Sequence, residues 1–73
     1  MINSKQISEI ISKYPIPNLR GRTIIYDYDD ENYSLFVRWE DGFNVSEDHG
    51  DYILDLNING DIIGIEILNI KIQ

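Results

Sequence analysis

The chain lacks the residues that usually stabilise very small proteins through covalent or metal links. It has no cysteine, and His49 is its only histidine among 73 residues. The absence of cysteine excludes disulfides and cysteine-ligated zinc, and no Cys/His cluster is present to hold a metal. We therefore expect one domain over residues 1–73 that depends on close packing or on self-association for its stability.

Long apolar runs are also missing. No stretch approaches the roughly 18 consecutive apolar residues that a membrane-spanning helix needs. The N-terminus has no basic region followed by an apolar run, the pattern of a secretory signal. We expect a cytoplasmic protein that does not contact a membrane.

Positive charge is scarce and unevenly distributed. Six Lys and Arg residues face 13 Asp and Glu residues, which gives a formal net charge of −7. Four of the six basic residues fall within residues 1–22, whereas twelve of the acidic residues fall within residues 23–73. Because nucleic-acid binding needs a basic footprint, we expect no direct nucleic-acid binding. A basic protein partner is compatible with this charge, and solubility is its simplest consequence.

The N-terminal segment predicts a helix over residues 4–14. Its apolar residues recur with the spacing of one helix face, at Ile7, Ile10, Ile11 and Tyr14. Asn3 or Ser4 can cap the start, and Gln6 completes a capping box with Asn3. Pro15 ends the helix. So short a helix is marginal alone, so its isoleucine stripe must cover another element.

That element is predicted to be a sheet. Residues 22–29 and 33–39 are rich in β-branched and aromatic residues and are joined by the turn-forming stretch "DDEN". If residue 28 pairs with residue 33, Tyr26 lies opposite Leu35 on an almost wholly apolar face. Trp39, near the end of the second segment, fits either a lid on the core or an interface anchor.

A second hairpin is predicted over residues 52–58 and 61–68, joined by a two-residue type I′ turn at Asn59-Gly60. The pairs that this turn predicts are Tyr52–Ile67, Leu54–Ile65 and Leu56–Ile63. The polar connection at residues 40–51 is expected to hold at most a short extra strand at residues 43–45.

The same region matches a calcium-loop pattern. The stretch from Asp55 to Glu66 satisfies D-x-[DN]-x-[DN]-G-x5-E, the loop of an EF-hand. An EF-hand needs a helix on each side of the loop, and the flanking residues here have strand character. Side chains that alternate between the faces of a hairpin cannot converge on one ion. We interpret Asn59-Gly60 as a turn and expect no metal site and no cofactor.

The outward faces of the two hairpins carry a second apolar set. Phe36 lies on the outward side of the first hairpin, and Ile53 and Ile62 lie on that of the second, beside Asp55 and Glu66. Contiguous exposed apolar area usually marks an interface, and a homodimer is the simplest one. Alternatively, the C-terminal "NIKIQ" or the 40–51 connection folds over this set.

No arrangement of residues predicts catalysis. His49 lies in the most loop-like segment, and the serines have no predicted partner base. The carboxylates near residues 27–31 fit turn chemistry and a solvated patch. We therefore expect a non-catalytic protein. Two arginines that flank Gly21 suggest a weaker alternative, an anion site formed by Arg20, Arg22 and Arg38.

Two stretches resemble a known family. "YDYDDENYSLFVRW" followed by "YILDLNINGDIIGIEIL" is similar to the bacterial family called domain of unknown function 2283. Its members carry a closing element D-h-D-x-x-G-x-h-x-G-I-E-h-L, which here begins at Asp55 and has Asn57 in place of the second Asp. The resemblance covers roughly residues 23–69, and the predicted helix lies outside it.

The resemblance implies a small β protein without assigned catalysis. Some members are similar to proteins encoded beside toxin-like genes, which suggests an antitoxin-type role. It carries over no catalytic residues. Glu66 is expected to pair with Arg38 across the sheet, and Gly64 to admit another backbone or side chain against it.

Together these features predict an α+β domain: an N-terminal amphipathic helix packed on a four-stranded antiparallel sheet of two hairpins, as a homodimer. The leading function is a small acidic binding protein that neutralises a protein partner, as an antitoxin or a phage anti-defence inhibitor would. The rivals are an oligomer that sequesters a small anion such as a nucleotide, and a purely structural subunit.

Overall fold

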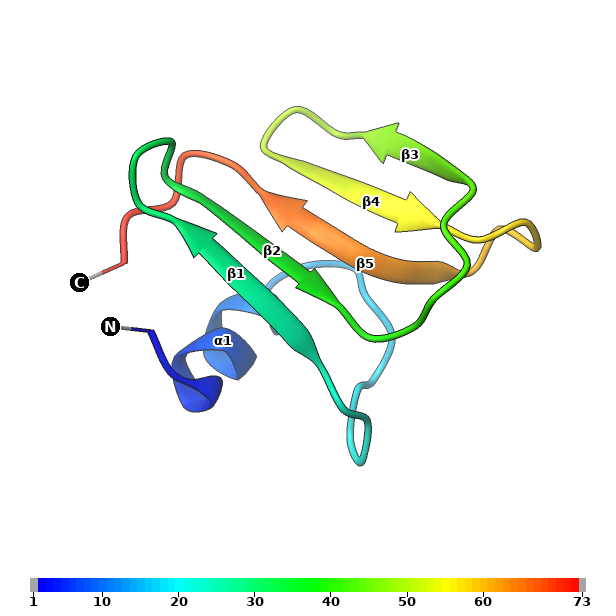
Figure 1. The fold of residues 1–73 in the computed structure, drawn as a ribbon, viewed down its shortest axis with the longest axis horizontal. Coiled ribbons are helices and arrows are strands. Elements are labelled where there is room, and N and C mark those ends of the chain that lie inside the picture. Colours follow the sequence, from blue (N-terminus) through cyan, green and yellow to red (C-terminus); the bar gives the residue numbers. More distant parts are fainter. Residues whose placement is uncertain (1, 73) are drawn as a thin grey trace.

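Over residues 2–72, the chain folds into one helix and one five-stranded antiparallel sheet. The computed structural model describes residues 2–72, and its elements in chain order are α1 (Ser4–Ile11), β1 (Ile25–Asp29), β2 (Ser34–Arg38), β3 (Val45–Asp48), β4 (Tyr52–Leu56) and β5 (Ile62–Ile67). The strand order is β1-β2-β5-β4-β3. Figure 1 shows α1 on one side of this sheet. The α+β class is confirmed, whereas the predicted four-stranded sheet is wrong because β3 adds a fifth strand.

Strand β3 comes from the polar connection and pairs with β4 at the edge of the sheet. All four of its residues are exposed. Backbone hydrogen bonds flank the pairing, from the Asn44 N–H to the Leu56 carbonyl (2.8 Å) and from the His49 N–H to the Tyr52 carbonyl (2.9 Å). The short strand predicted at residues 43–45 is therefore wrong in its bounds, because β3 runs over Val45–Asp48 and shares only Val45 with the prediction.

Helix α1 begins as its cap predicts and ends earlier than expected. The Asn3 side chain accepts from the Gln6 N–H at 3.0 Å, and the Gln6 side chain accepts from the Asn3 N–H at 2.9 Å, which confirms the capping box. The α-helix stops at Ile11, not at residue 14, because the next N–H groups, of Lys13 and Tyr14, donate to carbonyls three residues back, at Ile10 and Ile11, in a tighter turn that leads into Pro15. Within residues 2–72, no helix has the length and apolar character of a membrane span.

The first hairpin, β1–β2, has a register two residues away from the predicted one. Tyr28 pairs with Leu35, and Tyr26 pairs with Val37. A slip of two residues leaves every side chain on its predicted face, so the apolar pattern alone does not distinguish the two registers. The turn between the strands sets the register. In this turn the Asp29 carboxylate accepts from the N–H groups of Glu31 and Asn32, and Tyr33 adopts a left-handed φ of 54°.

The second hairpin, β4–β5, is confirmed for the pairs Tyr52–Ile67 and Leu54–Ile65. A β-bulge after Asp55 then shifts the register, so that Leu56 pairs with Ile62. The pairing predicted between Leu56 and Ile63 is wrong for this reason.

The turn of this hairpin also differs from the prediction. The Asn57 N–H donates to the Asp61 carbonyl at 3.0 Å and closes a loop of three residues, 58–60. Gly60 has a φ of 82°, but Asn59 has no positive φ, which a type I′ turn would require. A three-residue loop with glycine at the left-handed position therefore replaces the expected two-residue turn.

The core lies between α1 and the sheet. Its buried residues are Ile7, Ile11, Leu35, Val37, Trp39, Leu54, Ile65 and Ile67. Trp39 is 7% exposed and so belongs to the core, and its indole N–H donates to the Ile62 carbonyl at 3.1 Å. Ile70 and Ile72 pack against the same core, and the Tyr28 hydroxyl donates to the Ile70 carbonyl. The C-terminal segment up to Ile72 therefore covers the helix side of the sheet and not the opposite side.

Candidate functional site

The face of the sheet opposite α1 has no helix over it, and we call it the open face (Figure 1). Residues directly paired across neighbouring strands share a face, so the register identifies its members. Two rows cross all five strands. The first row is Ile25, Arg38, Gly64, Asp55 and Ser46, and the second row is Asp27, Phe36, Glu66, Ile53 and Asp48.

An ion pair lies in the first row. The Arg38 Nη2 donates to Asp55 Oδ2 at 3.2 Å, and the Asp55 residue is only 6% exposed. The Ser46 hydroxyl approaches the other carboxylate oxygen at 3.4 Å. The Arg38 guanidinium lies over the rings of Phe36 and Phe43, with Cζ 5.1 and 5.8 Å from the two ring centroids. Charge and stacking together hold Arg38 in one place.

Gly64 provides the space for this pair. A Cβ atom at position 64 would lie 3.0 Å from the Val37 carbonyl oxygen and 3.1 Å from Asp55 Oδ2. The expectation that Gly64 admits another side chain against the sheet is thus confirmed. The expected pair between Glu66 and Arg38 is wrong, because Arg38 and Asp55 share a row through Gly64 while Glu66 belongs to the next row.

Apolar side chains flank Glu66 in the second row. Phe36 lies on one side of it and Ile53 on the other, and all three are half-buried. Ile62 does not join them: its pairing beyond the bulge places it against the core on the helix side. Four of the five residues predicted for partner binding therefore share the open face, and Ile62 does not.

The open face is negative around this apolar centre. Its two rows contain four carboxylates and one guanidinium, and the guanidinium is already bound to Asp55. Phe43, which the sequence did not single out as a site residue, adds an aromatic ring that is 51% exposed. Its contact with Arg38 depends on the path of a loop, so no local pattern could have revealed it.

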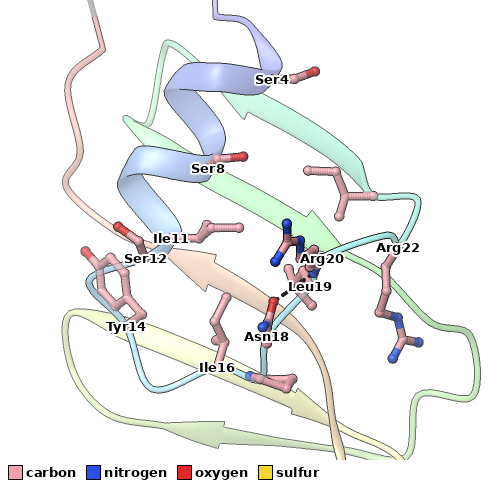
Figure 2. Close-up of a pocket in the computed structure, with 12 residues that line it drawn as sticks. Ser4, Ser8, Ile11, Ser12, Tyr14, Ile16, Asn18, Leu19, Arg20 and Arg22 are labelled. Carbon is pink, nitrogen blue, oxygen red and sulfur yellow. Dashed lines mark hydrogen bonds between the residues drawn. The ribbon is translucent and has the colours of Figure 1, made fainter.

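The three arginines of the alternative anion site do not converge. Arg20 and Arg22 line a groove beside α1 (Figure 2), whereas Arg38 lies in the first row of the open face. The Arg22 guanidinium donates to Glu40 Oε1 at 2.9 Å. Arg38 is held by Asp55 on the open face. Any anion site therefore involves the groove arginines without Arg38.

The calcium-loop pattern lies on the β4–β5 hairpin, as interpreted from the sequence. Asp55 and Glu66 are on strands, and Asp55 is bound to Arg38. No group of three or more His, Cys, Asp or Glu side chains in residues 2–72 is arranged to hold a metal ion. His49 contacts the Glu47 carboxylate at 2.6 Å and stacks on the Tyr52 ring, with the ring centroids 4.9 Å apart.

Comparison with known proteins supports a family assignment. Neither a curated protein nor a solved structure matches the chain significantly. The family model described as "Protein of unknown function (DUF2283)" matches residues 24–71, from the residue before β1 to the segment after β5. That match spans the whole sheet and leaves α1 outside. Since it covers well over half of the sequence, the protein belongs to the DUF2283 family.

Proposed function

We propose that this protein is a non-catalytic, cytoplasmic binding protein that neutralises a basic partner protein through its open face. An antitoxin or a phage anti-defence inhibitor would act in this way. One observation carries the proposal: half-buried Phe36 and Ile53 lie amid carboxylates on a sheet face that neither α1 nor the C-terminal segment covers. Apolar area with a charged surround is the usual composition of a protein interface.

The charge of the open face favours a basic partner. Asp27, Asp48 and Glu66 form no ion pair with any of the residues 2–72. A surface rich in Lys and Arg would complement them and would accelerate association at low salt. Proteins that act on nucleic acids carry such surfaces. Covering one with an acidic sheet would block access of the nucleic acid, which gives a physical route to neutralisation.

The open face is organised before a partner arrives. Arg38 is fixed by Asp55 and by two aromatic rings. The central strand β5 is hydrogen-bonded to β2 on one side and to β4 on the other. A rigid surface loses little conformational freedom on binding. Phe36 and Ile53 would supply the buried centre of the interface, while Glu66 would pair with a basic side chain.

The open face also bears on the predicted homodimer. An isologous dimer through this face would bring the same carboxylates together, and like charges across an interface are unfavourable. We therefore favour a basic partner over a second copy for this face. Analytical ultracentrifugation at low and high salt distinguishes a homodimer from a complex with a basic partner. Salt screens charge, so it would strengthen association between two like-charged faces and weaken association between faces of opposite charge.

The test is a capture experiment with matched charge variants. Tagged protein is incubated with native host lysate, and bound proteins and small molecules are identified by mass spectrometry. Wild type and Glu9→Lys, a reversal on the helix side, are expected to retain the same basic protein. Glu66→Lys is expected to lose it, and so is wild type at high salt.

Two outcomes would contradict the proposal. The first is equal capture by Glu66→Lys and Glu9→Lys, because the open face would then be dispensable. The second is a bound small molecule without any protein. A purely structural subunit would be insensitive to both charge reversals.

A further inference from the structure

A groove lies on the helix side of the sheet, between α1 and the segment at residues 16–24 (Figure 2). Its volume is about 600 Å³, within the range of small-molecule sites. Two arginines line it, and no Asp or Glu is among its lining residues, although the chain has 13 acidic residues. The Arg22 charge is balanced by Glu40, so Arg20 supplies the uncompensated positive charge of this groove in a strongly acidic protein.

The loop that carries the two arginines is held in shape. The Asn18 side chain accepts from the Arg20 N–H at 2.9 Å. The Arg22 N–H donates to the Leu19 carbonyl at 2.9 Å across a turn in which Gly21 has a φ of 79°. Only glycine adopts that backbone conformation readily. The position of Arg20 at the groove is thus fixed by the backbone around it.

The two arginines differ in how they are bound. The Arg22 guanidinium is anchored to Glu40, and Figure 2 shows it extending away from α1. Arg20 is exposed, and its guanidinium has no ion pair or hydrogen bond with any part of residues 2–72. Arg20 therefore has its full set of donors free for a ligand.

The rest of the groove combines hydroxyls with apolar side chains. Ser4 and Ser8 are four residues apart on α1 and so lie on one side of the helix, and in Figure 2 their hydroxyls point to the side where Arg20 lies. Neither hydroxyl bonds to another described residue. Ile16 and Leu19 are half-buried and form part of the apolar lining.

We propose that this groove binds a phosphate monoester that has an apolar or planar body, a nucleoside monophosphate being of suitable size. The phosphate takes the planar donor fork of Arg20 together with the serine hydroxyls, and the body of the ligand lies on the apolar lining. The site is separate from the open face and does not depend on the function proposed for it. Nearly all of it lies N-terminal to residue 24, outside the matched family region.

The experiment is an NMR titration of the ¹⁵N-labelled protein with adenosine 5′-monophosphate, adenosine and inorganic phosphate. Saturable shifts are expected for amides of residues 4–24 with the monophosphate, which should bind more tightly than either of its two halves. Arg20→Gln is expected to weaken binding at least about tenfold, since it removes a charge-assisted pair of hydrogen bonds. Lys13→Gln makes the same charge change outside the groove lining and should weaken binding less than about threefold.

Three results would overturn the proposal. One is the absence of saturable shifts with all three probes. Another is an equal loss of affinity in Arg20→Gln and Lys13→Gln, which would indicate diffuse attraction to the basic N-terminal segment. The third is a set of shifts that maps to the open face. Unchanged amide dispersion in both variants shows that the fold is intact, as expected for substitutions at exposed positions.

Discussion

Arg38 and Asp55 form an ion pair between two strands that are not neighbours. Arg38 is on β2 and Asp55 is on β4, and β5 runs between these strands. The pair is possible because the residue of β5 between them is Gly64, which has no side chain to separate the charges. This arrangement fixes the centre of the open face and leads to the first three predictions.

Gly64→Ala is expected to destabilise the fold by about 1–3 kcal/mol, the typical range for an overpacked site. The new methyl would crowd the Val37 carbonyl and the Asp55 carboxylate. Urea unfolding measures the loss. In an Asp55→Ala background the same change should cost less, because only the contact with Val37 remains. An equal cost in both backgrounds would mean that Asp55 does not determine the need for glycine.

Arg38→Met is expected to destabilise the protein by about 1–3 kcal/mol. It leaves a nearly buried Asp55 carboxylate without its cation, but Arg38 itself is partly exposed, so the cost should fall between that of a surface pair and that of a buried one. Loss of the buried Arg38 Nε, which has no hydrogen-bond partner in residues 2–72, offsets part of this cost.

A double-mutant cycle isolates the interaction between the two residues. Arg38→Met, Asp55→Asn and the double variant are compared by chemical unfolding, and a favourable coupling free energy above about 0.5 kcal/mol is expected for residues in contact. Additive effects would show that the ion pair contributes only through packing.

The pKa of Asp29 depends on the first hairpin turn. Hydrogen bonds from the Asn32 side chain, the Asn32 N–H and the Glu31 N–H lower the pKa of this carboxyl below its ordinary value of 3.8. Because the pKa is lower in the folded state, the associated stability is present above pH 3.8 and is lost as the pH falls through the folded-state pKa. Asn32→Ala should raise the pKa of Asp29 towards its ordinary value. Carboxyl ¹³C NMR titration measures the shift, and an unchanged pKa would refute the role of Asn32.

The cap of α1 should contribute measurably to stability. Asn3→Ala removes one half of the capping box and is expected to destabilise the protein by about 1 kcal/mol, which corresponds to a fall in Tm of about 4–8 °C for a domain of this size. Asn3→Ser keeps a capping oxygen and should lose much less. If both variants melt at the wild-type temperature, the helix is held by the packing of Ile7 and Ile11 alone.

The sequence by itself determined the elements whose side chains alternate or repeat. The isoleucine spacing and the Asn3 box predicted α1, and the apolar alternation predicted both hairpins and the core face that carries Leu35, Val37 and Leu54. These signals are local, because the spacing of apolar residues along an element predicts which of its sides is buried. Phe36, Ile53 and Glu66 were placed on the open face by the same alternation.

Only the tertiary structure decided the features that depend on strand order, register and backbone pairing. Strand β3 is exposed and polar, so its side chains carry no periodic signal and backbone hydrogen bonds define it. The bulge after Asp55 moved Ile62 to the core side, and the order β2-β5-β4 brought Arg38 to Asp55 over Gly64. Alternation specifies the face of the sheet on which a residue lies. It does not specify the residue paired with it on the next strand or the loop that contacts it, because those contacts join residues far apart in the chain.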